Sequence, residues 1–459
     1  MNLLAECLLT MKPLAEFLAC PSCQGDLSLD ANCPSCPIDF PSLGNIPWLF
    51  RNPKEEWASW QNRMGHNLAS LEGRAEALKV ASQQKDHPSQ KRLSRLLQAC
   101  REQSKFLKKI LAPFDVDHHH ALVNHVAMRS RLPKSQGLMS YYDNVFRDWV
   151  WGDQENQTAF EIVSSLMGDS RGGDMLVLGA GACRLPIDLH QAGLGQTTIA
   201  ADINPLLFLI CQKLIAGRKV DLYEFPLAPK SSNDAAVHHK ISWSGDLKPG
   251  FHQVLTDAFH PGLKTGVFDV VVTPWFVDIV HQDLKVTANH INQLLKPGGL
   301  WINYGSLAFF HADETKCYAR EEVPEVIKLE GFGDVTTRAD QHSYLDSPHS
   351  CQTRIEEVFS FRAVKTGVAA RATHREYLPP WLINLRQPVP KIPEFQQILA
   401  SNHLLIQVIS MIDGQRNLAD LGKLTAPIFN LQEAAASELV RQLLKDLYEN
   451  QLKNASWRA

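Results

Sequence analysis

Apolar and polar positions follow a repeated order in the middle of the chain. Short apolar runs within 175–184, 198–202 and 268–276 end in glycine or polar residues, and segments with helical apolar spacing come between them. Buried strands that alternate with amphipathic helices are the pattern of a mostly parallel sheet with helices on its faces. The pattern therefore predicts one large α/β domain over residues 141–368.

The flanking stretches have other patterns. Residues 53–140 are mostly polar with apolar residues at helical spacing, which predicts a helical layer over the α/β domain. Prolines punctuate residues 369–394 and indicate a linker. Residues 395–459 predict a small helical domain, either a three-helix packing or dimerisation unit or a winged helix.

Composition narrows the class of protein. A length of 459 residues with 44% hydrophobic residues suits two or three domains with real cores. A formal net charge of −3 gives no general reason to expect nucleic-acid binding. The N-terminus lacks the basic segment of a secretory signal, and no run of about 18 apolar residues predicts a membrane span. We therefore expect a cytoplasmic protein whose ten cysteines are reduced thiols, some of them binding metal.

The glycine-rich turn after the first apolar run is the main chemical signal. Gly179 and Gly181 lack a Cβ, so the backbone can approach a ligand closely. Asp202 closes the next apolar run, where an acid can accept hydrogen bonds from two ribose hydroxyls. Arg184 stands where a dinucleotide site would have its third glycine. The turn therefore favours S-adenosylmethionine as the cofactor, and an ordinary strand–helix turn is the alternative.

A second signal lies near the predicted fifth strand. The segment 294–303 reads as a helix end, a Lys-Pro-Gly-Gly turn and a buried strand. In class I methyltransferases such an element stands just before the fifth strand, and 268–276 is the candidate for the fourth. The two signals occur in the expected order. Through them the chain resembles class I methyltransferases, and the resemblance implies a Rossmann-like, doubly wound sheet.

Four cysteines form two identical pairs, Cys20-Pro-Ser-Cys23 and Cys33-Pro-Ser-Cys36. Each pair puts two thiolates on one tight turn, as a tetrahedral Zn²⁺ requires, and four thiolates leave no open position for catalysis. Residues 1–52 resemble the zinc-ribbon domains attached to some methyltransferases, including certain ribosomal RNA methyltransferases. The expectation is a structural Zn²⁺. A redox pair or incidental cysteines are the alternatives.

A more specific resemblance covers about half of the chain. Its residues are Phe146-Arg-Asp-Trp149, Gly179-Ala-Gly-Ala-Cys-Arg-Leu185, Phe276-Val-Asp-Ile-Val-His281 and Leu295-Lys-Pro-Gly-Gly-Leu-Trp-Ile-Asn-Tyr-Gly305. Through these segments the chain resembles the carnosine N-methyltransferase family. The resemblance implies transfer of a methyl group from S-adenosylmethionine to an imidazole or amine of a histidine-containing small molecule or peptide.

The resemblance also assigns cofactor contacts. Asn144 and Arg147 match a Gln and an Arg at the methionine end of the cofactor, although Asn144 is shorter than the Gln. An arginine suits a carboxylate because its guanidinium can form two parallel hydrogen bonds. The remaining implied cofactor residues are Gly179, Gly181, Asp202 for the ribose and Asp257 for the adenine amine.

The implied substrate side consists of Asp278, His281 and His311. Methyl transfer needs mainly positioning, because the sulfonium is already activated. A carboxylate such as Asp278 can accept one imidazole N–H and leave the other nitrogen as the nucleophile. A strand-end cap is the alternative role for Asp278, and a packing residue is the alternative for His281.

The sequence departs from the family where a tyrosine-rich strand supplies a substrate contact. Arg354 and Glu356 stand at positions where tyrosines are expected, whereas Tyr344 keeps an upstream tyrosine. The cofactor site therefore transfers better than the substrate site, and carnosine is only one candidate acceptor.

Two other functions fit parts of the sequence. One is a non-catalytic binding scaffold on a methyltransferase fold, which the intact Gly179, Asp202 and Asp257 argue against. The other is RNA methylation, which the zinc ribbon favours and the sequence Thr273-Pro-Trp-Phe276 argues against. Residues 395–459 resemble small winged-helix modules that include peptide-binding ones, so a peptide or protein partner is expected there.

Overall fold

The structure is a computed structural model. It describes residues 12–28, 31–83, 88–115, 142–168, 172–280, 282–309, 314–369, 386, 388, 403, 405–413 and 415–454, with backbone only at 62, 66 and 445–454. The chain divides into two compact units, Met1–Ala372 and Thr373–Ala459.

The first unit is built on one large sheet, which has nine strands among the described residues. In spatial order these are β12 (Phe332–Ser343), β13 (Ile355–Lys365), β11 (Leu295–Gly305), β10 (Phe268–Pro274), β5 (Gly173–Leu178), β6 (Gly195–Asp202), β9 (Phe251–Thr256), β4 (Ile46–Leu49) and β3 (Ser42–Leu43). The strands from β11 to β4 are parallel, and β13 is antiparallel to β11 and to β12. This confirms the predicted α/β fold with a mostly parallel sheet.

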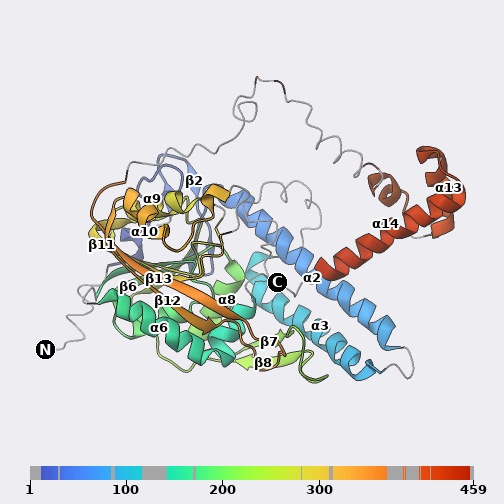
Figure 1. The fold of residues 1–459 in the computed structure, drawn as a ribbon, viewed down its shortest axis with the longest axis horizontal. Helices are drawn as coiled ribbons and strands as arrows, with labels where there is room; N and C mark the ends of the chain where they lie inside the picture. The colour runs from blue at the N-terminus through green and yellow to red at the C-terminus, as the bar shows by residue number, and fades with distance from the viewer. Residues whose placement is uncertain are drawn as a thin grey trace. The chain divides into compact units, whose positions relative to one another are not determined.

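Helices cover both faces of this sheet, as Figure 1 shows with α6 on one side and α9 and α10 on the other. The helices of this part are α6 (Asp153–Met167), α7 (Arg184–Gln191), α8 (Pro205–Ile215), α9 (Leu284–Leu294) and α10 (Val323–Leu329).

Trp301 of β11 is fully buried and packs edge-on against Phe361 of β13 at 4.8 Å between ring centroids. Its indole N–H donates to Thr273 Oγ1 at 2.9 Å, so the core keeps this polar group paired.

The Lys-Pro-Gly-Gly turn lies inside β11 rather than before it. The pairing of β10 with β11 moves from Phe268–Leu295 to Val270–Leu300, so the turn forms a bulge in the strand. Gly298 has φ of 76°, a left-handed conformation that glycine adopts without a steric penalty.

The cysteine-bearing segment is attached to the large sheet. It contains η1 (Leu14–Glu16), the hairpin β1 (Asn32–Cys33) with β2 (Ile38–Asp39), and the strands β3 and β4. Trp48 and Leu49 of β4 pair with the end of β9, and Phe17 stacks on Phe268 at 5.6 Å. The segment therefore extends one edge of the sheet and contributes to its core.

A helical hairpin follows, made of α2 (Pro53–Ser82) and α3 (Gln90–Leu111), with η2 (Ala112–Phe114) after it. A second, two-stranded sheet contains β7 (Val220–Glu224) and β8 (Val237–Ile241). Gln103 of α3 connects this small sheet to Tyr142, which stands just before the first helix of the α/β region. Its amide oxygen accepts from Tyr223 N at 2.7 Å, and its amide nitrogen donates to the Tyr142 hydroxyl at 2.6 Å.

The described part of the second unit is helical, with α13 (Leu418–Phe429) and α14 (Glu433–Asn454). Asn417 begins α13 with a capping box that includes Asp420, and Val408, Leu421 and Val440 form a small core. The winged helix and its peptide or protein partner stay predictions. Among the described residues, no helix is both long enough and apolar enough to cross a membrane.

Candidate cofactor and acceptor site

The glycine-rich turn between β5 and α7 has a backbone that favours glycine. Gly179 has φ of 73° and Gly181 of 56°. A Cβ on Gly179 would lie 2.8 Å from Cδ2 of Phe276, so a side chain there would clash. A Cβ on Gly181 would meet no atom within 4 Å, so the backbone at Gly181 faces open space that a ligand could occupy.

Asp202 ends β6 beside this turn. Its Oδ2 accepts from Gly181 N and its Oδ1 accepts from Asn204 N, both at 2.8 Å. Burial raises the pKa of Asp202, and these backbone N–H groups oppose the rise. Each carboxylate oxygen has a second acceptor position, so Asp202 could also accept from a pair of hydroxyls.

Asp257 follows the end of β9, the strand next to β6. Its Oδ1 accepts from Phe259 N at 2.9 Å, and its Oδ2 lies 3.4 Å from Nδ1 of His260. Because β5, β6 and β9 are parallel neighbours, their carboxyl ends share one edge of the sheet. The predicted glycines, Asp202 and Asp257 therefore lie along that edge.

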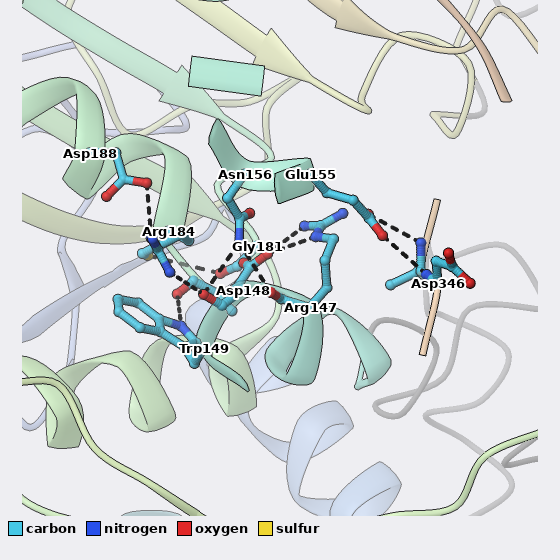
Figure 2. A network of polar contacts seen from close by, with 12 residues as sticks. Arg147, Asp148, Trp149, Glu155, Asn156, Gly181, Arg184, Asp188 and Asp346 are labelled. Carbon is cyan, nitrogen blue, oxygen red and sulfur yellow. Dashed lines mark hydrogen bonds and ion pairs between the residues drawn. The ribbon is translucent and has the colours of Figure 1, made fainter. Parts of the chain in front are cut away.

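Arg147 begins a π-helical turn, η4 (Arg147–Trp151), that is tied to the glycine-rich turn (Figure 2). Its guanidinium pairs with the buried Asp148, with Nε 2.8 Å from Oδ1. The Trp149 indole N–H donates to Ala182 O at 2.9 Å, and Arg184 donates to Asp148 O at 2.8 Å. These contacts fix the position of Arg147 relative to the turn.

A further link leads from η4 toward the segment between β12 and β13. Glu155 of α6 accepts from the backbone N–H groups of Leu345, at 3.2 Å, and Asp346, at 3.0 Å. The Arg147 guanidinium lies 6.0 Å from the ring centroid of Tyr344 in the same segment. Asn144 lies in the short helix α5 (Asp143–Phe146), and its carbonyl accepts from Arg147 N.

Asp278 follows β10, on the same edge of the sheet. Its Oδ2 accepts from the Ser306 hydroxyl and from Ala308 N, the latter at 3.2 Å. Its Oδ1 is buried and has no hydrogen-bond partner within the described part of the chain. Burial raises the pKa of Asp278, because a desolvated carboxylate resists ionisation.

An aromatic group lies near Asp278, whose negative charge adds to the effect of burial in raising the pKa of Tyr344. Trp275 packs on Tyr344 at 4.3 Å and on Tyr304 at 5.8 Å between ring centroids. Trp275 has φ of 49°, and its N–H donates to Tyr304 O at 2.6 Å. A left-handed tryptophan is strained, and such strain is concentrated at functional sites.

Arg354 and Glu356, the two departures from the family, form an ion pair at this group. The Arg354 guanidinium lies 5.0 Å from the Tyr344 ring centroid. The negative charge of Glu356 also contributes, after burial, to the raised pKa of Asp278. His281 and His311, the other two predicted acceptor residues, lie outside the described residues.

Sequence reasoning missed Trp275, Tyr304 and Ser306 as parts of this region. Trp275 directly follows β10, the fourth strand of the α/β order, which ends at Pro274. Its position in the sequence could have indicated a role, since the residues just after a parallel strand lie at the carboxyl edge of the sheet, where ligands bind.

The four N-terminal cysteines form a compact group, with their sulfur atoms all within 4.8 Å of one another. Gly25 N lies 3.4 Å from the Cys23 sulfur, and this contact, together with hydrogen bonds to the Cys36 and Cys33 thiols, lowers the pKa of the Cys23 thiol to about 7. Gln24, which follows the first cysteine pair, donates to Pro261 O at 3.0 Å, and Pro261 lies in the segment between β9 and β10. The group fits a tetrahedral thiolate site, and it is packed against the segment that follows Asp257.

Strand order and site together define the class of protein. From one edge inward, the order β12-β13-β11-β10-β5-β6-β9 has only β13 reversed, and the glycine-rich turn follows the central strand β5. This is the fold of class I S-adenosylmethionine-dependent methyltransferases. A family model described as carnosine N-methyltransferase matches residues 124–366, more than half of the 459 residues. The chain belongs to the carnosine N-methyltransferase family.

Individual relatives are distant. A carnosine N-methyltransferase from Dictyostelium discoideum is 25% identical over 198 residues, which cover 38% of this chain and 42% of the relative. The chain thus spans less than half the length of that relative.

Two solved structures are also similar. A methyltransferase from Thermotoga maritima is 15% identical, covering 49% of this chain and 94% of that chain with a TM-score of 0.30. A phosphoethanolamine N-methyltransferase from Haemonchus contortus is 12% identical, covering 51% and 58% with a TM-score of 0.34.

Proposed function

We propose that this protein is an S-adenosylmethionine-dependent N-methyltransferase whose acceptor is an imidazole or amine nitrogen of a histidine-containing small molecule or peptide. Membership of the carnosine N-methyltransferase family supports the reaction class. The observation that carries the acceptor class is the buried Oδ1 of Asp278, which has no hydrogen-bond partner among the described residues. An unpaired buried acceptor is costly, and a ligand N–H would remove that cost.

The cofactor would lie along the edge formed by β5, β6 and β9. Gly181 faces open space, and Asp202 would accept from the ribose hydroxyls while keeping its backbone partners. Asp257 would receive the adenine amine, and Arg147 with Asn144 would hold the methionine end. The carboxylate of the methionine moiety suits an arginine whose orientation is already fixed by Asp148.

Asp278 would act on the acceptor and not on the cofactor. Its Oδ1 would accept an imidazole or amine N–H, so that the nucleophilic nitrogen keeps its lone pair. Bound S-adenosylmethionine would supply an activated methyl group, whose carbon–sulfur electron pair would return to sulfur as the acceptor nitrogen bonds to the carbon. Asp278 and the faces of Trp275 and Tyr344 would stabilise the positive charge that grows on the acceptor, until Asp278 or solvent takes its proton.

We also propose that Cys20, Cys23, Cys33 and Cys36 hold one structural Zn²⁺. The closeness of the four sulfur atoms supports this proposal. Because the segment is short on its own, the metal would supply much of its stability.

The test is transfer of labelled methyl groups from S-adenosylmethionine by the full chain. The acceptors are carnosine, other histidine-containing dipeptides, longer histidine peptides, and RNA. We expect labelling of the dipeptides or peptides, and strong loss of it in Asp278→Asn. Labelling of RNA alone would contradict the acceptor class. Absence of cofactor binding in calorimetry would instead indicate a non-catalytic scaffold.

A further inference from the structure

A second group of metal-ligating side chains lies away from the cysteines. Glu224 ends β7, His239 lies on β8, and His349 comes from the segment between β12 and β13. One potential ligand atom from each of the three lies within 4.8 Å of the others. His349 is far in the sequence from the paired strands β7 and β8 that carry the other two, so the fold itself brings it to them.

Glu224 is buried, with 3% of its surface exposed. Its Oε2 lies 2.8 Å from Nε2 of His239 and 3.3 Å from the Trp151 indole nitrogen, and the Ser347 hydroxyl donates to Oε1. A carboxylate at this depth requires strong compensation for its lost hydration. A cation shared with His239 would provide it.

His349 is oriented as a metal ligand would be. Its Nδ1 lies 2.9 Å from Oδ1 of Asp234, whose other oxygen accepts from the Ser231 hydroxyl at 2.5 Å. When Asp234 accepts the Nδ1 proton, the His349 Nε2 has its lone pair available. Carboxylates that bond the far nitrogen of a histidine are the usual outer partners of metal-bound imidazoles.

We propose that Glu224, His239 and His349 bind one divalent transition-metal ion, for which Zn²⁺ is the best match. Two imidazoles and one carboxylate are an established Zn²⁺ ligand set, and the set leaves a position for water or another ligand. On binding, Nε2 of His239 gives up the proton that it donates to Glu224 and the ring takes a proton at Nδ1, so that His239 binds the metal as its other neutral tautomer. This site goes beyond the proposed methyl transfer and does not depend on it.

The metal would join the β7–β8 sheet to the segment between β12 and β13. His349 O accepts from Lys230 N at 3.0 Å, and Cys351 N donates to Ala228 O at 2.8 Å, so backbone bonds already connect the segment to the region after β7. The same segment carries Tyr344. A bound ion would hold the segment between β12 and β13 more firmly, and with it the position of Tyr344 relative to Arg147.

The test is zinc content of the full chain after chelation, re-addition of Zn²⁺ and dialysis. We expect the wild type to hold one more zinc per chain than His349→Ala or Glu224→Gln, with Cys33→Ser losing a different zinc. His238→Ala is the matched control, because His238 neighbours His239 on β8 but bonds Asp221 at 3.0 Å. It should keep the wild-type content.

Asp234→Asn supplies a milder variant that keeps all three ligands. We expect it to weaken Zn²⁺ binding by about 10–100-fold, as loss of an outer partner of a metal-bound histidine does. The Kd is measured in a Cys33→Ser background, so that only this site contributes, and circular dichroism checks folding. Equal zinc content in folded wild type and His349→Ala, or an unchanged Kd in Asp234→Asn, would overturn the proposal.

Discussion

Two parts of the carboxyl edge of this sheet are built in different ways: the part after β5, β6 and β9, here called the cofactor edge, and the part after β10, here called the acceptor edge. At the cofactor edge, Asp202 and Asp257 are held by backbone N–H groups at the ends of their own and adjacent strands. At the acceptor edge, Asp278 depends on the Ser306 hydroxyl and Ala308 N, from the segment after β11. One oxygen of Asp278 stays without a partner among the described residues, whereas both oxygens of Asp202 are bonded.

This difference indicates where ligand binding completes the structure. The Asp202 carboxylate is ready before the cofactor arrives, so the ribose adds bonds to an ordered site. The Asp278 carboxylate has a buried oxygen without a partner in the described part of the chain, and such an oxygen costs about 1–3 kcal/mol when nothing pairs with it. A polar acceptor would recover that cost. The acceptor edge therefore favours a ligand that donates a hydrogen bond to Oδ1 of Asp278. The cofactor edge instead offers the ribose an acceptor, Asp202, that is already ordered.

The largest expected effect separates the two edges. Asp278→Asn should lower kcat/KM for the true acceptor by about 10²-fold or more, the scale for a carboxylate that handles protons. Asparagine is neutral and cannot stabilise charge growing on the acceptor. Cofactor Kd should stay close to that of the wild type. Near-normal turnover in a stable variant would make Asp278 a structural cap.

The same variant tests the energetic cost of burying the Asp278 carboxylate. Burial raises the pKa of Asp278 above that of the unfolded chain, about 3.9. A group with a raised pKa contributes most to stability below the unfolded pKa, and this contribution is lost as pH rises through the folded pKa. Tm of the ligand-free wild type should therefore fall relative to Asp278→Asn as pH rises from about 4. A pH-independent difference would contradict the assignment.

The next effect belongs to the cofactor edge. Asp202→Ala should weaken S-adenosylmethionine binding by about 2–3 kcal/mol, because a charge-assisted acceptor is lost. The measurement is calorimetry. Asp202→Asn is the control, since it keeps the side-chain shape and one acceptor, and its loss should be smaller. Unchanged affinity in Asp202→Ala would mean that the ribose is held elsewhere.

The two edges also differ in how far the sequence predicts them. The glycine turn and Asp202 follow local patterns, because strand, turn and acid are close in sequence. The packing of Trp275 on Tyr344 and the link from Asp278 to Ser306 join distant segments, and no local pattern encodes them. The parallel pairing of β4 with β9 is likewise a tertiary contact.

A smaller effect should reach the cofactor edge from the cysteine segment. Cys33→Ser should remove one zinc and lower Tm, since the metal stabilises this short segment. The segment supports the region after Asp257, where Gln24 donates to Pro261 O. Cofactor affinity should therefore fall by about 0.5–2 kcal/mol, the range for coupling through packed contacts. The measurements are elemental analysis and calorimetry. Equal zinc in wild type and variant would contradict the proposed site, and Cys317→Ser, at an exposed cysteine, is the control.

The smallest effect concerns Arg354, which stands where the family has a tyrosine. Its guanidinium lies over the Tyr344 ring and pairs with Glu356, and its side chain is more than half exposed. An exposed cation–π contact contributes about 0.5–1 kcal/mol, so Arg354→Ala should change the acceptor KM by a few-fold and leave cofactor Kd unaltered.

Arg354→Tyr restores the residue type that the family has at this position and tests whether the departure changes acceptor choice. If the departure redirects acceptor choice, the tyrosine should raise kcat/KM for carnosine relative to longer histidine peptides, whereas Arg354→Ala should not. Arg338→Ala is the control, because Arg338 lies on β12 and bonds Asp340 instead. Identical acceptor preferences in all three variants would show that Arg354 only covers Tyr344. The acceptor edge would then owe its selectivity to Asp278 and the aromatic group, and the contrast with the cofactor edge would rest on them alone.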